Sequence, residues 1–430
     1  MTRINTSPLT IVHIEKLVSG GEGLARTEYG IVLVPGVLKG ETVEIDSIHR
    51  RKGVLRGIVS RIIKPAPERV SPFCHHFIEG CGGCQWQHII YNKQIAIKNE
   101  ILRENLQRIA HIDPLLDDPL YDPEFRHTRI RTHFHRDPQT LQIGFFRAKT
   151  HDVIPIHSCP LCVPPINKLL KFLNEQKDYL KGVHSFSVIT SDQHAHLHFK
   201  TKKKRPELLR QLCNRLDADR DMKSGGSAES NGHTYWHHGT QWICIEVNGI
   251  PFKTNSQSFF QGHHRLNHHL VRNVKDMIGN EKREILIDLF CGVGLFGLSV
   301  AHQFKKVIGI DSDRQAILFA QENARLNKIH NTEFYLCDLT LDNILTDLDK
   351  SADVVILDPP RSGCPKRLRE QIIDLSPQKI IVVSCDSATM ARDIKRFTDR
   401  GYYMISCTSI DLFPQTFHIE AITHLQKSGT

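Results

Sequence analysis

A thiol and a carboxylate each follow an apolar run in the second half of the chain. Cys385 follows the run that starts at Lys379, and Asp358 follows the run at 354–357. Both runs are typical of buried strands, and ligand sites in open α/β sheets lie at the carboxyl ends of the strands. We therefore expect Cys385 and Asp358 to share one site. This pairing indicates an enzyme in which a cysteine attacks carbon.

A third apolar run, from Ile285, leads directly into a glycine-rich loop. Gly292, Gly294 and Gly297 have the GxGxxG spacing, which lets the backbone approach a ligand closely at the start of a helix. Asp311 ends the next strand, where it can accept hydrogen bonds from ribose hydroxyls. By itself this loop fits a dinucleotide and S-adenosylmethionine equally well.

Residues further along the chain favour the methyl donor. Asp338 ends the third predicted strand, where its carboxylate can accept from an adenine amino group. Asp358 begins an Asp-Pro-Pro-Arg tetrad, which resembles the acceptor-side motif of nucleic-acid methyltransferases. Enzymes of that kind that methylate amines have an aromatic residue after the prolines, whereas this chain has Arg361. A carbon acceptor is therefore the better prediction.

Methylation of a pyrimidine carbon would give Cys385 its task. C5 is a poor nucleophile, but a thiolate that adds to C6 produces an enolate whose C5 can attack a sulfonium methyl group. A base must then remove the C5 proton so that the sulfur can leave. Glu420 is the candidate base because it stands in a largely apolar stretch, where an acid is costly to bury. A capping or ion-pair role for Glu420 is the alternative.

The alternative for a strand-end cysteine is a small buried hydrophobe. We interpret Cys291, Cys337 and Cys407 in this way. Cys385 differs because polar residues follow it and because a methyl-donor loop is predicted in the same sheet.

The pattern along the chain predicts three domains. Residues 1–62 read as short strands separated by glycine turns, which is typical of a small barrel. Residues 63–262 form a mixed α+β region with a helix expected at 92–109, and the polar, glycine- and serine-rich segment 223–232 is interpreted as an exposed loop. Residues 263–430 alternate between helices and apolar strands, as in a parallel, doubly wound sheet.

Composition and charge indicate a globular protein with a polyanionic partner. The chain has 430 residues, is 40% hydrophobic and 24% charged, and carries a net charge of +9. No apolar run approaches the ~20 residues that span a bilayer, and the N-terminus lacks a signal peptide, so we expect a cytoplasmic location. Three basic clusters favour nucleic acid: Arg50, Arg51, Lys52, Arg56, Arg61 and Lys64; Arg126, Arg129, Arg131 and Arg147; and 202–205. The 26 histidines show no metal-ligand spacing.

A group of cysteines in the second domain has the spacing of a metal site. Cys74, Cys81 and Cys84 form a C-x6-C-G-G-C motif, and Cys159 stands directly before a proline much later. In a reducing compartment these are thiols or ligands rather than disulfides. Four thiolates suit zinc or an iron–sulfur cluster, and the spacing alone favours zinc.

Taken together, these residues resemble the RNA 5-methyluridine methyltransferases, class I S-adenosylmethionine-dependent enzymes that methylate uracil C5 in ribosomal or transfer RNA. The resemblance covers nearly the whole chain. It implies that residues 1–62 form a TRAM domain, an OB-like RNA-binding β-barrel, and that residues 263–430 form a Rossmann-like catalytic domain. The matching segments are 20–26, 34–41, 258–261, 288–294, 309–313, 358–363, 383–393 and 411–420.

The resemblance also implies a role for individual residues. Cys385 would be the nucleophile and Glu420 the base. The positions implied to contact the cofactor are Gln261, Phe290, Asp311, Asp338 and Asp358. One departure is Leu295, which stands where some members have an asparagine that touches the cofactor. We expect this contact to be missing or to be made by the backbone, without loss of activity.

For the cysteines, the resemblance reverses the preference for zinc. Members with a TRAM domain bind a 4Fe–4S cluster, which would be held here by Cys74, Cys81, Cys84 and Cys159. Cys159 is chosen over Cys162 because the cysteine of the family directly precedes proline. The first gap is one residue longer than is usual in the family. Because methyl transfer needs no electron, the cluster is expected to serve folding or RNA positioning.

A TRAM domain together with a cluster resembles the ribosomal enzymes more than the transfer-RNA enzyme, so large-subunit ribosomal RNA is the preferred substrate. The alternatives are a transfer-RNA uracil-C5 methyltransferase, a cytosine-C5 methyltransferase, and an RNA-binding factor that keeps an inactive methyltransferase fold. The sequence identifies no protein partner.

Overall fold

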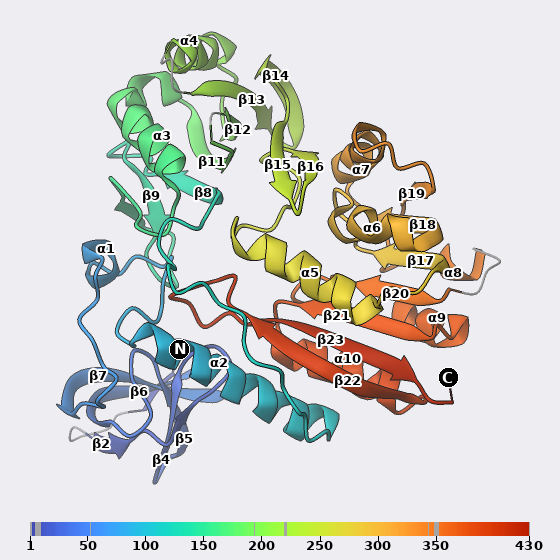
Figure 1. Ribbon diagram of the computed structural model, residues 1–430. Helices are drawn as coiled ribbons and strands as arrows, with labels where there is room; N and C mark the ends of the chain where they lie inside the picture. Colours follow the sequence, from blue (N-terminus) through green and yellow to red (C-terminus); the bar gives the residue numbers. More distant parts are fainter. Residues whose placement is uncertain are drawn as a thin grey trace.

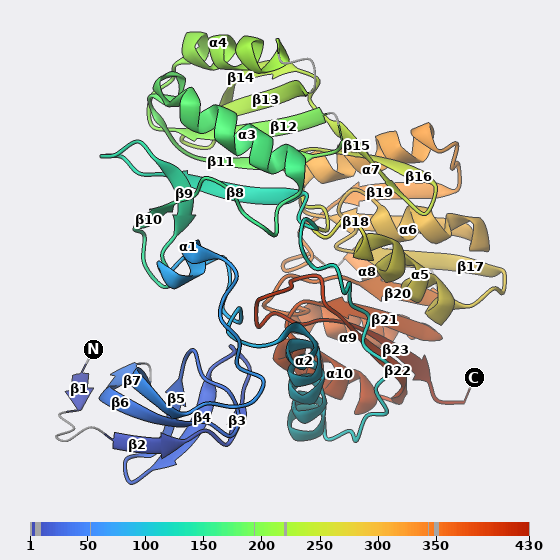
Figure 2. The ribbon, with the colours of Figure 1, turned by 60° about the vertical axis from the view of Figure 1, so that its left-hand side comes forward.

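The computed structural model describes residues 2–4, 10–51, 53–192, 194–218, 222–342, 344–347 and 352–429. Residues 5–9 of the first predicted domain and Lys52 of the first basic cluster lie outside these ranges. Figures 1 and 2 show an N-terminal β-sheet, a central α+β region and a C-terminal α/β region, with one long helix running between the first and the last. No helix within the described residues is long and apolar enough to cross a membrane.

The N-terminal sheet has seven strands and a core of its own. The strands are β1 (Thr2–Ile4), β2 (Thr10–His13), β3 (Lys16–Leu17), β4 (Gly23–Thr27), β5 (Gly30–Val34), β6 (Thr42–Arg51) and β7 (Val54–Lys64). They follow the order β1-β6-β7-β5-β4-β3, with β2 also paired to β6. Val32, Val43 and Ile45 are fully buried between them because alternate residues of a strand point to the same face.

The central region is built on a second seven-stranded sheet, in the order β10-β9-β8-β11-β12-β13-β14. Its strands are β8 (Arg131–Arg136), β9 (Ile143–Phe146), β10 (Val153–Pro155), β11 (Val183–Thr190), β12 (His194–Thr201), β13 (Lys223–Ser230) and β14 (His233–Gly239). The helices α3 (Pro164–Glu175) and α4 (Pro206–Asp217) pack apolar faces on this sheet, as Figure 2 shows. A short helix, α1 (His75–Ile78), follows Cys74.

The prediction of an exposed loop at 223–232 is wrong. Most of this segment is β13, which lies between β12 and β14 and is largely buried. Its small residues serve close packing rather than flexibility: a Cβ on Gly225 would lie 1.7 Å from the carbonyl oxygen of Thr240. The Ser227 hydroxyl lies 2.9 Å from Nδ1 of His198 on the neighbouring strand, so its polar group is satisfied inside the sheet.

The C-terminal region contains the predicted parallel sheet, extended by an antiparallel edge. The seven strands follow the order β19-β18-β17-β20-β21-β23-β22, and only β23 runs against its neighbours. The strands are β17 (Arg283–Leu289), β18 (Phe304–Asp311), β19 (Thr332–Leu336), β20 (Val354–Leu357), β21 (Lys379–Ser384), β22 (Tyr402–Ile410) and β23 (Glu420–Lys427). A hairpin of β15 (Ile243–Val247) and β16 (Ile250–Thr254) precedes them.

Helices cover both faces of this sheet, as expected for strands that are apolar on both sides. They are α5 (Leu266–Ile278), α6 (Leu295–Val300), α7 (Arg314–Leu326), α8 (Ile344–Asp347), α9 (Lys366–Leu375) and α10 (Ser387–Thr398). Short 3-10 turns occupy Lys177–Leu180 and Ala301–Gln303.

The helix predicted at 92–109 lies between the N-terminal sheet and the C-terminal region. It is α2 (Tyr91–Asn105), and it continues into a π-helical turn over Leu106–Ala110. Figure 2 shows α2 beside α10, close to the N-terminal sheet. Ile101 and Leu102 belong to the same buried cluster as Ile394 and Phe397 of α10. The helix is thus part of the core of the C-terminal region, although it ends more than 150 positions before that region begins.

Candidate active site

Cys385 lies in the short connection between β21 and α10, as predicted. The next residue, Asp386, caps the helix: its carboxylate accepts from the backbone N–H of Ala388 (3.1 Å) and Thr389 (2.9 Å). The Thr389 hydroxyl donates to the carbonyl oxygen of Arg361, at 3.3 Å. The loop that carries the thiol is therefore attached to the loop that follows Asp358.

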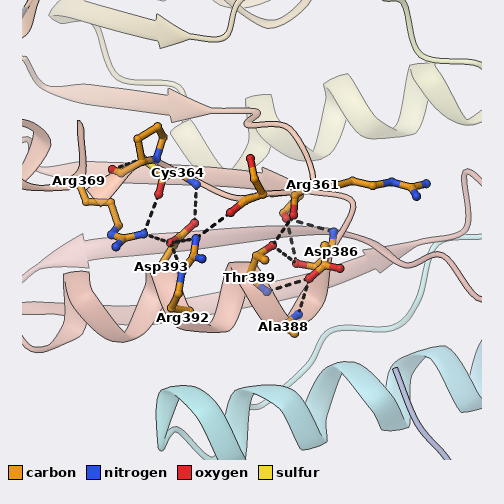
Figure 3. Close-up of polar contacts among 11 residues, drawn as sticks. Arg361, Cys364, Arg369, Asp386, Ala388, Thr389, Arg392 and Asp393 are labelled. Carbon is orange, nitrogen blue, oxygen red and sulfur yellow. Dashed lines mark hydrogen bonds and ion pairs between the residues drawn. The ribbon is translucent and has the colours of Figure 1, made fainter. Parts of the chain in front are cut away.

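A polar network behind these two loops fixes the segment after the Pro-Pro pair (Figure 3). The buried Asp393 carboxylate accepts from the backbone N–H of Cys364 at 2.7 Å and pairs with Arg369 and Arg392. Arg392 also donates to the carbonyl oxygen of Ser362, at 3.0 Å. Gly363 has a φ of 78°, and a Cβ there would lie 2.6 Å from the Asp393 carboxylate, so the turn requires glycine.

Glu420 and Cys385 interact electrostatically across this edge of the sheet. Glu420 is the first residue of β23, is 2% exposed, and its Oε1 has no hydrogen-bond partner among the described residues. Burial, reinforced by Asp358, raises the pKa of Glu420 well above its ordinary value, and Arg361 opposes that shift. Burial and then Glu420 raise the pKa of Cys385 to about 11, while Arg361, hydrogen-bonded to the thiol, lowers it.

Three acids from adjacent parallel strands gather next to this pair. They are Asp288 in β17, Asp311 at the end of β18 and Asp358 after β20; Asp358 and Asp311 raise the pKa of Asp288, and Asp311 raises that of Asp358. Burial is the largest cause and brings the pKa of both Asp288 and Asp358 to about 7. Because the carboxylates repel one another, the group favours a ligand that carries positive charge.

Two of these acids also shape the glycine loop. The Asp288 carboxylate accepts from the backbone N–H of Gly297 at 2.8 Å, and Asp311 accepts from that of Gly292 at 2.8 Å. The loop is thus folded around carboxylates, at the N-terminus of α6. Sequence reasoning did not single out Asp288 as a site residue, although its place at the end of an apolar run, four residues before Gly292, was a usable signal.

Gln261 reaches the same group of acids from the central region. It is buried, and its side chain hydrogen-bonds Asp358, which lowers the pKa of that acid against the effect of burial. The loop that carries it is held by Arg131, whose guanidinium donates to the carbonyl oxygens of Asn255 (3.3 Å), Ser256 (2.9 Å) and Ser258. Sequence reasoning counted Arg131 only as a member of a basic cluster.

The remaining predicted cofactor positions differ in their surroundings. Phe290 follows β17 directly, has a left-handed φ of 61° and packs partly on the core. Asp338 is exposed, its carboxylate accepts from the backbone N–H (2.9 Å) and hydroxyl (2.6 Å) of Thr340, and it is not among the groups that shift the pKa of Asp288, Asp311 or Asp358. Leu295 begins α6 and is buried in the core at 7% exposure, where it offers a ligand no polar contact.

A cleft beside Gln261 presents two features suited to a flat, polar substrate. Phe259 is 60% exposed, whereas its neighbour Phe260 is buried. Phe259 lines the cleft together with Arg129 and Phe413. An exposed phenyl ring in such a cleft is a stacking surface for an unpaired base.

The four predicted cysteine ligands line a single cavity, together with Arg129. They are Cys74, Cys81, Cys84 and Cys159. Cys162 is fully buried behind Cys159; its thiol hydrogen-bonds that of Cys159, whose pKa falls to about 6. Burial instead raises the pKa of Cys84 to about 12.

A second group of possible metal ligands adjoins Cys74. His75, His76 and Glu79 place ligand atoms within 4.8 Å of one another, and Nδ1 of His76 lies 3.0 Å from the Glu79 carboxylate. The sequence analysis found no metal-ligand spacing among the histidines. His75 and His76 are adjacent in the chain, and the fold is needed to bring both side chains close to Glu79.

Comparison with known proteins supports this assembly of elements. A family model described as tRNA (Uracil-5-)-methyltransferase matches residues 90–428. The 23S rRNA (uracil(1939)-C(5))-methyltransferase RlmD of Psychromonas ingrahamii is 31% identical over 96% of this chain and 94% of the relative. RlmD of Vibrio parahaemolyticus is 29% identical over 99% of this chain and 98% of the relative. The structure of Pyrococcus abyssi tRNA (uracil-54, C5)-methyltransferase in complex with S-adenosyl-L-homocysteine has a TM-score of 0.76 at 24% identity, covering 97% of this chain and all (100%) of that one.

The mixed α/β sheet with its glycine loop defines a methyltransferase fold of the S-adenosylmethionine-dependent class, as the structural likeness shows. Because the family model matches most of the chain, the protein belongs to the tRNA (uracil-5-)-methyltransferase family. This confirms the predicted family and the predicted enzyme class, an RNA uracil-C5 methyltransferase that uses S-adenosylmethionine.

Proposed function

We propose that this enzyme methylates C5 of a uridine in structured large-subunit (23S) ribosomal RNA. One observation carries the proposal: Cys385, Arg361 and Glu420 meet at the edge of the sheet where three acids surround the glycine loop. The ribosomal target is supported by the relatives named RlmD, which match over nearly the whole chain. Transfer RNA is the second candidate, supported by the printed name of the family.

The acids and the glycine loop would hold S-adenosylmethionine, which supplies an electrophilic methyl group. Asp311, at the end of β18, would accept from the ribose hydroxyls, and Asp338 at the exposed rim from the adenine amino group. Asp288, Asp358 and Gln261 would surround the positively charged end of the ligand. The mutual repulsion of the acids suits this ligand because the positive charge offsets it.

Cys385 and Glu420 would then act in succession on the uracil ring. The Cys385 thiolate adds to C6, Arg361 stabilises the negative charge that arises beside it, and the enolate carbon C5 takes up the methyl group. Glu420 accepts the C5 proton, and the electrons of that bond expel the sulfur from C6. A base whose pKa is raised by burial is suited to this proton transfer near neutral pH.

We also propose a 4Fe–4S cluster at Cys74, Cys81, Cys84 and Cys159. The donor set fits: all four thiols face one cavity, and Arg129 beside them would offset the negative charge of a thiolate cluster. Protein purified without oxygen is expected to be brown, with iron and sulfide in equal amounts. Four-coordinate zinc without iron would overturn this assignment.

RNA would bind across the face shared by the N-terminal sheet and the cysteine region. A cleft there is lined by Arg56 and Lys149, together with Cys81, Cys84 and Phe417. Residues 1–62 would serve as a TRAM domain on this face, and an enzyme acting on ribosomal RNA would work in the cytoplasm.

RNA that contains 5-fluorouridine tests the chemistry directly. With fluorine in place of hydrogen, C5 carries no proton that a base can remove, so the sulfur cannot be expelled from C6. The wild-type enzyme with S-adenosylmethionine should therefore form an adduct that survives denaturation. Cys385→Ala should form none. Failure of both proteins to crosslink, with RNA binding retained, would favour the RNA-binding factor; a crosslink only to fluorocytidine RNA would favour the cytosine enzyme.

The target is tested by mass spectrometry of RNA from a gene-deletion strain. Loss of 5-methyluridine from large-subunit ribosomal RNA is the expected result. Loss confined to transfer RNA would refute the ribosomal assignment.

A further inference from the structure

The segment that leads to Glu420 has no regular secondary structure of its own. It comprises residues 411–419, between β22 and β23, and is called the base loop below. Glu420 follows it directly, and the buried Oε1 of Glu420 has no hydrogen-bond partner among the described residues. The position of this carboxylate is therefore set by the main chain, which is held on one side by the pairing of Glu420 with Ile410 of β22 and on the other by the base loop.

Gln415 is the most constrained residue of the base loop. It is 2% exposed and has a φ of 66°, a left-handed conformation that is unfavourable for a residue with a side chain. Its carbonyl oxygen accepts from two successive backbone N–H groups, those of Gln85 (2.9 Å) and Trp86 (3.0 Å). Such a conformation persists only where the surroundings impose it.

The Gln415 side chain is held as firmly as its backbone. Gln94 of α2 donates from Nε2 to Oε1 of Gln415 at 3.0 Å and accepts from the Gln415 backbone N–H at 3.2 Å. The same Nε2 lies within hydrogen-bond distance of the carbonyl oxygens of Trp86 (3.0 Å) and Ile89 (2.8 Å). One amide thus connects α2, the segment after Cys84 and the base loop.

The partners of Gln415 belong to the cysteine region. Gln85 and Trp86 follow Cys84 directly, and Cys84 lines the cavity of the four thiols. A change in the path of the chain at Cys84 would therefore move the two N–H groups that bind Gln415, five positions before Glu420. No other residue of the base loop receives hydrogen bonds from this cysteine segment in the part of the chain that the structure describes.

Other contacts secure the two ends of the base loop without involving the cysteines. At its start, the buried Asp411 carboxylate pairs with Lys98 at 2.5 Å and accepts from the Tyr91 hydroxyl at 2.7 Å. Near its end, Arg361 donates to Nε2 of His418 at 3.1 Å, and burial keeps His418 neutral by lowering its pKa to about 4. Between these anchors Lys98 also donates to the carbonyl oxygen of Phe413 at 3.0 Å, and Gln415 is held by the cysteine segment and Gln94.

We infer that Gln415 is a positioning residue of the methylation site, which transmits the conformation of the cysteine loop to Glu420. The inference rests on the proposed function, because it concerns the base of that reaction. It gives the cysteine region a part in one step of the reaction, the removal of the C5 proton.

The chemistry separates this step from the earlier ones. The S–C6 and C5–methyl bonds form first, as the bond between the methyl group and the donor sulfur breaks. Only then does the C5–H bond break, with the proton going to Glu420 and the electrons expelling Cys385 from C6. If Glu420 is misplaced, the first stage proceeds and the methylated RNA stays bound to Cys385.

Two substitutions at Gln415 test the inference. Gln415→Gly keeps the left-handed backbone, the carbonyl and the backbone N–H but loses the side-chain hydrogen bond from Gln94. Gln415→Asn tolerates the left-handed conformation, but its amide is one methylene too short to reach Gln94. Ser376→Gly is the matched control: Ser376 has a φ of 59° and its hydroxyl accepts from Lys427 at 2.5 Å, remote from the site.

Each protein is incubated with ordinary uridine RNA and methyl-labelled S-adenosylmethionine, and denaturing gels separate bound from released RNA. We expect turnover by Gln415→Gly to fall at least tenfold, the KM for RNA to stay within twofold, and labelled RNA to accumulate on the protein. Gln415→Asn should show the same pattern in milder form, and Ser376→Gly should release product like the wild type.

The same assay distinguishes failure of the proposed function from failure of the positioning role. If the wild type fails to crosslink 5-fluorouridine RNA, the proposed function fails. If it does crosslink and both Gln415 variants release product normally, the positioning role is refuted. The role is also refuted if the variants lose crosslinking to fluorouridine RNA, since Cys385 would then be affected too. Chelation of metal from the wild type should likewise trap labelled RNA, and normal release would refute the link to the cysteine loop.

Discussion

The acidity of Cys385 gives the most direct test of the site. Burial and Glu420 raise its pKa to about 11, so at pH 7 roughly one molecule in 10,000 carries the thiolate. Because the thiolate is the nucleophile, alkylation of Cys385 should accelerate about tenfold for each pH unit between 7 and 10. This slope is measured by brief labelling with iodoacetamide and mass spectrometry of the peptide that contains Cys385.

Two substitutions should move this profile in opposite directions. Glu420→Gln removes a negative neighbour and lowers the pKa of Cys385. Arg361→Gln removes the positive hydrogen-bond partner and raises the pKa. Cys244, an exposed cysteine, is the internal reference in every sample.

The outcomes that would refute this electrostatic account are specific. A labelling rate that reaches its plateau below pH 8 in the wild type would show that the thiol is not held in its neutral form. Shifts of the same sign in Glu420→Gln and Arg361→Gln would contradict the opposite effects that these two charges have on the pKa of Cys385. Either result would remove the argument that Arg361 prepares the nucleophile.

Three further predictions concern other parts of the site. Lys98→Met leaves the buried Asp411 carboxylate unpaired and should destabilise the protein by about 3–5 kcal/mol in urea unfolding, most of which the double variant Lys98→Met/Asp411→Asn should restore. The affinity for S-adenosylmethionine should fall at least about tenfold from pH 8 to pH 6, as measured by calorimetry. The reason is that Asp288 and Asp358, each with a pKa of about 7, take up protons and lose their attraction for a cation. An affinity independent of pH would contradict this. Gly363→Ala should reduce crosslinking to 5-fluorouridine RNA, because its Cβ would lie 2.4 Å from the Arg392 guanidinium, while Gly429→Ala, at a similar φ with open space around it, should not.

Sequence reasoning located the parts of the site that depend on one strand at a time. Cys385, Asp311 and Asp358 each end an apolar run, and parallel strands bring such ends together whatever the rest of the chain does. The role of Arg131 could not be found in this way, because its partners at Asn255–Ser258 are more than 120 positions away. The same holds for Gln94 and Gln415, which are 321 positions apart.

The prediction from composition was wrong for residues 223–232, because small residues suit both exposed loops and tightly packed strands. Glycine and serine at 223–232 suggested an exposed loop, but the same residues allow β13 to lie tightly between two neighbours, and only the tertiary contact at Thr240 distinguishes the two cases. The cysteine spacing was more informative, since the four chosen residues line one cavity and Cys162 stands behind it.

The proposed nucleophile and the proposed base are held by different sets of contacts. Cys385 is placed by contacts within the catalytic region: the Asp386 cap, the Thr389 hydroxyl and the network around Asp393. Glu420 is placed by its pairing with Ile410 of β22 and by the base loop, whose partners lie in α2 and beside Cys84. Perturbing the N-terminal half should therefore slow the release of methylated RNA more than the formation of the adduct, so that the two stages of one reaction report separately on the two halves of the chain.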